Sequence, residues 1–253
     1  MLNFEARGDG PRPMIIIHGF LGQGRNLGAL ARAWGRLAPE LRFLLPDLPG
    51  HGRSPALDGR GVPEIADALV AFAESEGLTH PFPLVGHSLG GRVALAARQR
   101  HPKKVGKVVL LDIRPGPMIG SDTETVVAAL LRVPERTESR DAMRDALMTE
   151  GLSKPLSEWL VMSGDTDDDG FAWRIDREAL ADFREKLSQE DLWDAVTPDT
   201  VCIRGGNSTY VSDEDVARYR EVGATVHEVE GCGHFLHAEK PKQVAELLAQ
   251  SLD

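Results

Sequence analysis

A serine stands between small residues at positions 86–90, which read Gly-His-Ser-Leu-Gly and follow a short apolar run. Glycines two positions before and after Ser88 leave room for a sharp strand-to-helix turn, and such a turn exposes the serine hydroxyl as a nucleophile. That hydroxyl needs a base to react, and the oxyanion created by its attack needs N–H donors. We therefore predict that Ser88 is the nucleophile and that the backbone N–H of Leu89 is one oxyanion donor.

Three further motifs flank this serine. Residues 18–20 read His-Gly-Phe, residues 47–54 read Asp-Leu-Pro-Gly-His-Gly-Arg-Ser, and residues 231–235 read Gly-Cys-Gly-His-Phe. In this order, and together with the serine turn, the motifs resemble the alpha/beta-hydrolase superfamily over essentially the whole chain. The resemblance implies a catalytic triad in the chain order serine, acid, histidine. It also implies that His234 is the base, with His237 as the alternative, and that the Phe20 N–H is the second oxyanion donor.

The acid of the triad departs from the pattern of most relatives, in which it follows a late strand. Alignment of that region puts Ser208 at the acid position, and a hydroxyl cannot supply the charge that stabilises an imidazolium. Small bacterial carboxylesterases and acyl-CoA esterases resemble this chain in the Gly-Gly-Asn-Ser run that ends there. Asp112 closes the strand after the serine helix, at the sheet edge where catalytic groups gather. We predict that Asp112 is the acid and keep Asp213, near a predicted helix start, and Asp176 as alternatives.

A parallel sheet is needed to position these groups, and the sequence supplies suitable strands. Runs that are apolar on both faces, separated by amphipathic helical patterns, predict buried parallel strands with helices on both faces of the sheet. The predicted strands are 14–17, 42–45, 83–85, 108–111, 201–203 and 225–229. We therefore expect an α/β fold, and the family resemblance implies a mostly parallel sheet of eight strands.

Residues 115–198 interrupt this alternation, because they contain no convincing strand. They predict four helices, at 124–131, 140–148, 156–162 and 177–187. We expect a helical lid here, inserted into a core formed by residues 1–114 and 199–253. Residues 165–176 match an EF-hand calcium loop except for an Asp in place of the final Glu. Because no flanking helix pair is evident, a solvated acidic loop is the favoured interpretation.

Aromatic and imidazole side chains near the motifs and in the lid could line a substrate pocket. These residues are His87, Trp159, Trp173, Tyr210 and Phe235. The tryptophans have a second interpretation, since such residues more often form the core of a lid. The eight histidines show no zinc-ligand spacing, and the glycines around the serine are not followed by a phosphate-binding lysine. We expect neither a metal nor a cofactor.

The composition limits the kinds of binding partner and the cellular compartment that we expect for this protein. The 253 residues carry a net charge of -10 and no long run of Lys or Arg, which argues against binding to nucleic acid or anionic membranes. Cys202 and Cys232 are too far apart to form a disulfide framework, and no apolar stretch has signal-peptide or membrane-spanning length. We expect a cytoplasmic protein, a monomer or homodimer, whose partner is a small-molecule substrate.

These features predict an ester hydrolase that works through a Ser-His-Asp triad and an acyl-enzyme, on carboxylic esters with small or short-to-medium acyl chains. The serine at position 88 argues against haloalkane dehalogenases and epoxide hydrolases, which use aspartate there. Acyl-CoA thioesterase, carbon–carbon bond hydrolase and cofactor-free haloperoxidase are the enzymatic alternatives. A ligand-binding receptor that kept the fold is the non-enzymatic one, and the intact serine, base and oxyanion loop argue against it.

Overall fold

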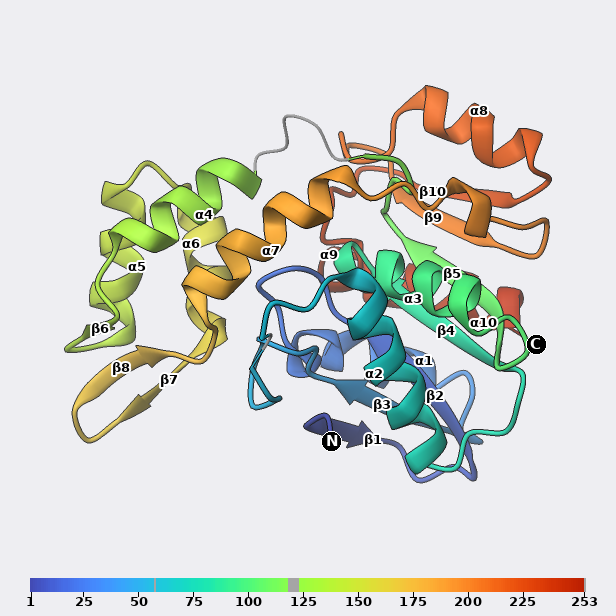
Figure 1. The fold of residues 1–253 in the computed structure, drawn as a ribbon, viewed down its shortest axis with the longest axis horizontal. Coiled ribbons are helices and arrows are strands. Elements are labelled where there is room, and N and C mark those ends of the chain that lie inside the picture. The colour runs from blue at the N-terminus through green and yellow to red at the C-terminus, as the bar shows by residue number, and fades with distance from the viewer. Residues whose placement is uncertain (57, 118–122, 253) are drawn as a thin grey trace.

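A seven-stranded sheet forms the centre of the computed structural model, which describes residues 1–56, 58–117 and 123–252 (Figure 1). Its strand order is β1-β3-β2-β4-β5-β9-β10. The strands are β1 Phe4–Arg7, β2 Arg12–Ile17, β3 Leu41–Pro46, β4 Phe82–His87, β5 Val105–Leu111, β9 Val201–Gly205 and β10 Thr225–Val229. Only β1 pairs antiparallel, with β3, and every other neighbouring pair is parallel. The α/β prediction and all six predicted strands are confirmed.

The expected number of eight strands is wrong for the described residues, which form seven strands in this sheet. The family pattern, rather than any apolar run in this sequence, underlies the expectation of eight. In the seven-stranded sheet, the apolar runs did not predict β1. Its four residues read Phe-Glu-Ala-Arg and lie half-buried or exposed at the sheet edge. Such a short polar edge strand lacks the continuous apolar run that marks a buried parallel strand.

Both faces of the sheet are covered because alternate side chains of each central strand point to opposite sides. Ile15 and Ile17 join one apolar cluster, whereas Met14 and Ile16 join the other. The first cluster lies under α2 Val62–Ser75, α3 Leu89–Arg100 and α8 Asp213–Glu221. The second lies under α1 Gly28–Gly35, α9 Leu236–Glu239 and α10 Pro241–Leu252. This arrangement explains why these strands read as apolar throughout.

Residues 115–198, called the insertion below, leave the sheet after β5 and return before β9. Their described helices are α4 Thr123–Arg132, α5 Arg140–Thr149, α6 Lys154–Leu160 and α7 Arg177–Gln189, with the short 3₁₀ turns η2 Val161–Ser163 and η3 Trp193–Ala195. In Figure 1, α4, α5 and α6 stand to one side of the core, and α7 leads back toward it. The four predicted helices are therefore present.

The prediction of no strand in the insertion is wrong. A small antiparallel sheet forms from β6 Arg136–Thr137, β7 Gly164–Asp167 and β8 Gly170–Trp173, in the order β6-β8-β7. These strands are two to four residues long and β7 is polar, so they lack a recognisable hydrophobic period. The segment predicted as an acidic loop is thus largely a hairpin. Two of its carboxylates form ion pairs, Asp165 with arginines that include Arg25 and Arg174, and Asp167 with Arg136.

One buried arginine of α3 holds both ends of the insertion. The Arg92 side chain is 1% exposed, and its guanidinium donates to the carbonyls of Arg114 and Gly116, each at 2.8 Å, and of Glu190 at 2.6 Å. Burial lowers the pKa of Arg92 to about 10, so the group remains charged at neutral pH. The start of the insertion and Glu190, near its end, therefore meet at one side chain of the core.

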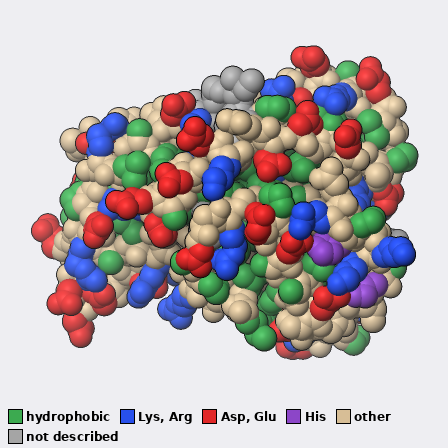
Figure 2. All heavy atoms as spheres, in the orientation of Figure 1, with side chains coloured by type: hydrophobic (Ala, Val, Ile, Leu, Met, Phe, Trp, Pro, Cys, Tyr) green, Lys and Arg blue, Asp and Glu red, His purple; other side chains and the backbone are tan. Residues whose placement is uncertain are grey.

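The visible surface carries both signs of charge. Figure 2 shows acidic and basic side chains interspersed over the insertion and the core on this face. None of the helices in the described part of the chain combines the length and the apolar character needed to cross a membrane.

Candidate active site

The turn that carries Ser88 is strained and tightly packed. Ser88 joins β4 to α3 with φ 51° and ψ −118°, and its N–H donates to the Leu111 carbonyl at 3.1 Å. A Cβ at Gly86 would lie 2.3 Å from the Gly90 carbonyl, and one at Gly90 would lie 2.4 Å from the Ile17 carbonyl. Larger residues would therefore clash with backbone at both positions, which is the physical basis of the Gly-x-Ser-x-Gly spacing.

Asp112 lies at the end of β5, next to the strand that carries the serine. It is fully buried and its φ is 54°. Its Oδ1 accepts the Gly205 N–H at 2.9 Å, and its Oδ2 accepts the Nδ1–H of His234 at 2.7 Å and the Ser208 hydroxyl at 2.5 Å. The structure thus brings Asp112 and His234 together. Ser208, at the position where the sequence alignment expects an acid, donates its hydroxyl to Asp112.

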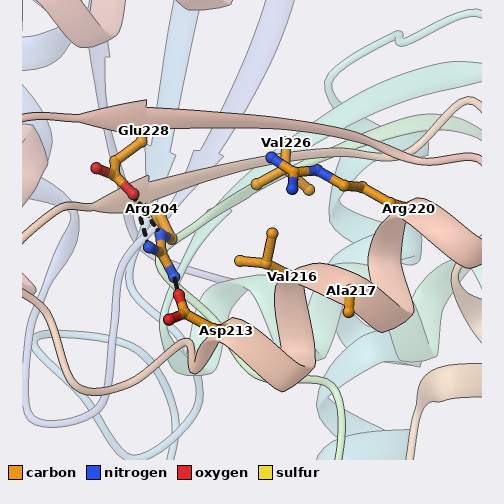
Figure 3. A pocket seen from close by; sticks show the side chains of 7 residues that line it. All are labelled: Arg204, Asp213, Val216, Ala217, Arg220, Val226 and Glu228. Carbon is orange, nitrogen blue, oxygen red and sulfur yellow. Dashed lines mark hydrogen bonds and ion pairs between the residues drawn. The ribbon is translucent and has the colours of Figure 1, made fainter.

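The two alternative acids lie elsewhere. The Asp213 side chain is 95% exposed at the start of α8, and its carboxylate accepts from Arg204 at 2.9 Å (Figure 3). Arg204 also pairs with Glu228, so Asp213 belongs to a surface ion-pair network. Asp176 caps α7 by accepting the Ala179 N–H at 3.0 Å. Within the described residues, neither carboxylate is hydrogen-bonded to His234.

A cavity of about 190 Å³ joins Ser88 and His234. Four of the five predicted lining residues contribute to it: His87, Trp159, Tyr210 and Phe235. The Tyr210 ring stacks on the His234 imidazole, with centroids 3.7 Å apart and planes at 14°. Further lining residues are Gly19, Phe20, Leu21, Thr123, Val126 and Leu156. No sequence motif marks Thr123, Val126 and Leu156, and only the amphipathic pattern of the insertion helices could have indicated them.

Trp173 does not line this cavity, so that prediction is wrong. The residue lies on β8, where its ring packs edge-on against Phe171 and its indole N–H donates to the Pro134 carbonyl at 3.3 Å. It borders a separate hollow with Arg136 and Asp176. The alternative interpretation of the tryptophans, packing within the insertion, holds at this position.

The two predicted oxyanion donors are placed beside the serine. Leu89 is the first residue of α3, where a backbone N–H has no partner within the helix. Phe20 lines the cavity, and its N–H has no hydrogen-bond acceptor among the described residues. Gly19 allows the Phe20 loop to approach, since a Cβ there would lie 3.1 Å from the Ser88 Cβ. Within the described residues, neither of these two N–H groups donates a hydrogen bond to another group.

Four histidines around the site are buried and their burial lowers their pKa values, to about 3 for His51 and His237. The other two are His18 and His87. His18 Nε2 accepts the Leu48 N–H at 2.9 Å and His51 Nε2 accepts a backbone N–H at 3.2 Å, which requires the neutral imidazole. His237, the alternative base, packs against the His87 ring with centroids 4.3 Å apart, and its Nδ1 has no partner among the described residues.

Acidification is expected to destabilise the protein from pH 6.5 downward. Since the folded-state pKa values of these histidines lie below the unfolded value of about 6.5, the unfolded chain binds protons first as the pH falls. The contribution of each such histidine to the free energy of unfolding is fully present above pH 6.5. It is lost as the pH falls toward 3, by about 1.4 kcal/mol per pH unit. Urea unfolding at pH 7, 6, 5 and 4 measures this slope.

A His237→Leu variant is the matched comparison, because it removes one ionising group whose Nδ1 makes no hydrogen bond within the described chain. Its stability should fall less steeply with acid than that of the wild type. Equal slopes for the two proteins would contradict the assignment of His237 as a buried neutral histidine.

No group of three His, Cys, Asp or Glu side chains in the described ranges is arranged to hold a metal ion.

Comparison with known proteins identifies the family. The chain matches the model of the alpha/beta hydrolase family over residues 14–247, and it therefore belongs to that family. It is 30% identical to lipase LipV of Mycobacterium tuberculosis, over 96% of this chain and 94% of that protein. It is 29% identical to esterase YbfF of Escherichia coli (strain K12), over 95% and 93%. The solved structure of a marine microorganism esterase superposes with a TM-score of 0.88 at 27% identity, covering 99% of each chain.

Proposed function

We propose that this chain is a serine ester hydrolase in which Ser88, His234 and Asp112 form the catalytic triad. The observation that carries the proposal is the 2.7 Å hydrogen bond from His234 to the buried Asp112 carboxylate, beside a cavity that His234 shares with Ser88. The family membership and the names of the relatives, lipase and esterase, support the same class of reaction.

The proposed reaction begins with attack of the Ser88 oxygen on the acyl carbonyl carbon. His234 Nδ1 keeps its proton toward Asp112, so Nε2 is the nitrogen that takes the serine proton. The resulting imidazolium then gives this proton to the departing alcohol. Water, activated by the same nitrogen, cleaves the acyl-enzyme and restores the serine. The N–H of Gly205 and the hydroxyl of Ser208 donate to the buried Asp112 carboxylate and replace the water that it would otherwise bind.

The negative charge that develops on the carbonyl oxygen is assigned to the backbone N–H groups of Phe20 and Leu89. Donors fixed before the reaction stabilise the tetrahedral oxyanion without reorganisation, which is the largest single contribution in many acyl-transfer enzymes. The helix that starts at Leu89 adds the positive end of its dipole at the same place.

The substrate class that we propose is a carboxylic ester with a small or short-to-medium acyl chain. The cavity of about 190 Å³ is lined mainly by apolar and aromatic side chains, with no Lys or Arg among them. The rings of Trp159 and Phe235, with centroids 4.9 Å apart, stand together in its wall. An apolar wall of this kind suits an acyl chain and offers no partner for a charged head group.

We further propose that the insertion, residues 115–198, acts as a lid on a core of residues 1–114 and 199–253. Its helices α4 and α6 contribute Val126, Leu156 and Trp159 to the cavity. We also propose a cytoplasmic location for the protein, supported by its two free and buried cysteines, Cys202 and Cys232.

Two measurements on the wild-type protein test the proposed function. A fluorophosphonate probe is expected to label the protein once, at Ser88, because only an activated serine reacts with it. A panel of p-nitrophenyl esters from acetate to palmitate should show the highest kcat/KM at short to medium acyl lengths. A protein that resists the probe and leaves every ester intact would refute the assignment, and a maximum at palmitate would overturn the proposed acyl length.

A further inference from the structure

The loop that carries the Phe20 donor contains a leucine in a backbone conformation that leucine rarely adopts. Leu21 has φ 62°, in the left-handed region where the Cβ of an L-residue crowds its own backbone. The residue is 2% exposed and lines the cavity. A leucine persists in this region only where its surroundings hold it there.

Two side chains hold the backbone of Leu21, one on each side of its Cα. On the N-terminal side, the Leu21 N–H donates to His51 Nε2 at 3.2 Å, and His51 belongs to the core. On the C-terminal side, the Leu21 carbonyl accepts the hydroxyl of Ser163 at 2.5 Å, and Ser163 belongs to the insertion. The torsions φ and ψ of Leu21 together set how these two peptide groups are oriented relative to each other. Release of either group would let Leu21 relax, so the peptide between Phe20 and Leu21 would turn and would shift Phe20, whose own N–H belongs to the preceding peptide.

Ser163 is fixed by its own surroundings. It is 2% exposed and ends the 3₁₀ turn η2, and its carbonyl accepts the Arg174 N–H at 2.9 Å. The preceding carbonyl, that of Met162, accepts from the side chains of Gln23 and Arg25, both in the loop that follows Leu21. The insertion thus lies along the Leu21 loop and directs one buried hydroxyl at it.

We propose that Ser163 is a positioning residue for the oxyanion hole, holding the strained Leu21 backbone so that the Phe20 N–H points at the reacting carbonyl. This inference rests on the proposed serine hydrolase mechanism. It makes the insertion part of the catalytic apparatus, because the oxyanion loop is complete only when the insertion is seated on it. Catalytic groups displaced by about 1 Å lose on the order of a hundredfold in rate, so a small relaxation of this loop has a measurable effect.

The test compares Ser163→Ala with Ser157→Ala. Ser157 lies in α6, directly before η2, and it is fully buried with a hydroxyl that has no partner within the described residues. Ser163→Ala is expected to lower kcat for p-nitrophenyl butyrate by roughly 10- to 100-fold with KM within about twofold, since the lost contact matters in the transition state. Ser157→Ala should keep the wild-type kcat. Fluorophosphonate labelling of Ser163→Ala should slow in parallel with kcat.

Arg25→Met separates positioning from simple docking. It removes contacts to Met162, Gly164 and Asp165 in the insertion but none to Leu21. Ser163 stays held by the Arg174 N–H in this variant, so its kcat should remain well above that of Ser163→Ala. An equal drop in kcat would mean that loss of the other insertion contacts is enough to lower the rate, and would overturn the proposal. Equal kcat values for Ser163→Ala and Ser157→Ala would overturn it as well.

Ser163→Cys serves if the alanine variant does not fold, because it keeps the shape of the side chain and replaces the hydroxyl by a somewhat larger thiol. Its thiol is a weaker donor, so a smaller fall in kcat at unchanged KM is expected, and a wild-type kcat would contradict the proposal. Fluorophosphonate labelling of the wild type distinguishes failure of the hydrolase mechanism from failure of the proposed role of Ser163. An unlabelled wild type refutes the hydrolase mechanism itself, whereas a labelled wild type with unaffected Ser163 variants refutes only the role of Ser163.

Discussion

Replacement of Ser88 by alanine is expected to abolish ester hydrolysis, with kcat falling by roughly a millionfold or to the background rate. Of the other described lining residues only Tyr210 and Thr123 carry a hydroxyl, and neither stands on the strained turn between β4 and α3 that presents Ser88. A p-nitrophenyl acetate assay at pH 8 measures the loss. Fluorophosphonate labelling should disappear in the same variant.

The fold should survive this change. Alanine differs from Ser88 by one oxygen, and the turn is held by the backbone bond to Leu111 and by the glycines around it. The thermal midpoint is therefore expected to stay close to that of the wild type. A folded Ser88→Ala protein with undiminished turnover would exclude Ser88 as the nucleophile.

Replacement of Asp112 by asparagine is expected to lower kcat by roughly 10⁴-fold. The Asn carbonyl oxygen would remain on the Gly205 N–H, which leaves the amide NH₂ facing His234 Nδ1. An NH₂ group donates, so Nδ1 would have to accept and the imidazole proton would move to Nε2. Nε2 could then no longer take the proton of Ser88. Steady-state kinetics on p-nitrophenyl acetate measure the effect.

Asp213→Asn is the matched control for this experiment, because it makes the same chemical change at a carboxylate of the exposed Arg204 network. Its kcat should stay within about twofold of the wild type. The reverse pattern, with an active Asp112→Asn and an inactive Asp213→Asn, would transfer the role of the acid to Asp213.

The fold was predictable where the sequence contains strong periodic patterns. The central sheet strands are buried on both faces and read as apolar runs, so their parallel pairing follows from the sequence, whereas the edge strand β10 is largely exposed or half-buried. The strand β1 and the three strands of the insertion were missed because they are short, polar or half exposed. Their formation depends on pairing partners that are distant in the sequence, which local patterns do not report.

The site, too, was predictable where local sequence patterns determine it and was not predictable where contacts between distant residues do. Ser88 and its glycines could be recognised because backbone packing allows no other residue type at Gly86 and Gly90. Asp112 could be inferred because the end of β5 must face the end of β4 in a parallel sheet. The role of Ser208 as a donor to Asp112 was not predicted, because the sequence shows only that a carboxylate is missing at its position.

The guanidinium of Arg92 joins the start of the insertion and Glu190, near its end, to α3, and Arg98 of the same helix donates to the Ala195 carbonyl. Because both ends of the insertion are held at the core, lengthening the chain between them adds little to the closure cost, about 0.6 kcal/mol for each doubling of its length. Helices could be exchanged, lengthened or removed beyond that junction without moving β4 or β5. We therefore expect this junction to accept exchanged insertions, which would change the lining of the cavity while the core stays the same, provided that each insertion restores a hydroxyl over the Leu21 carbonyl.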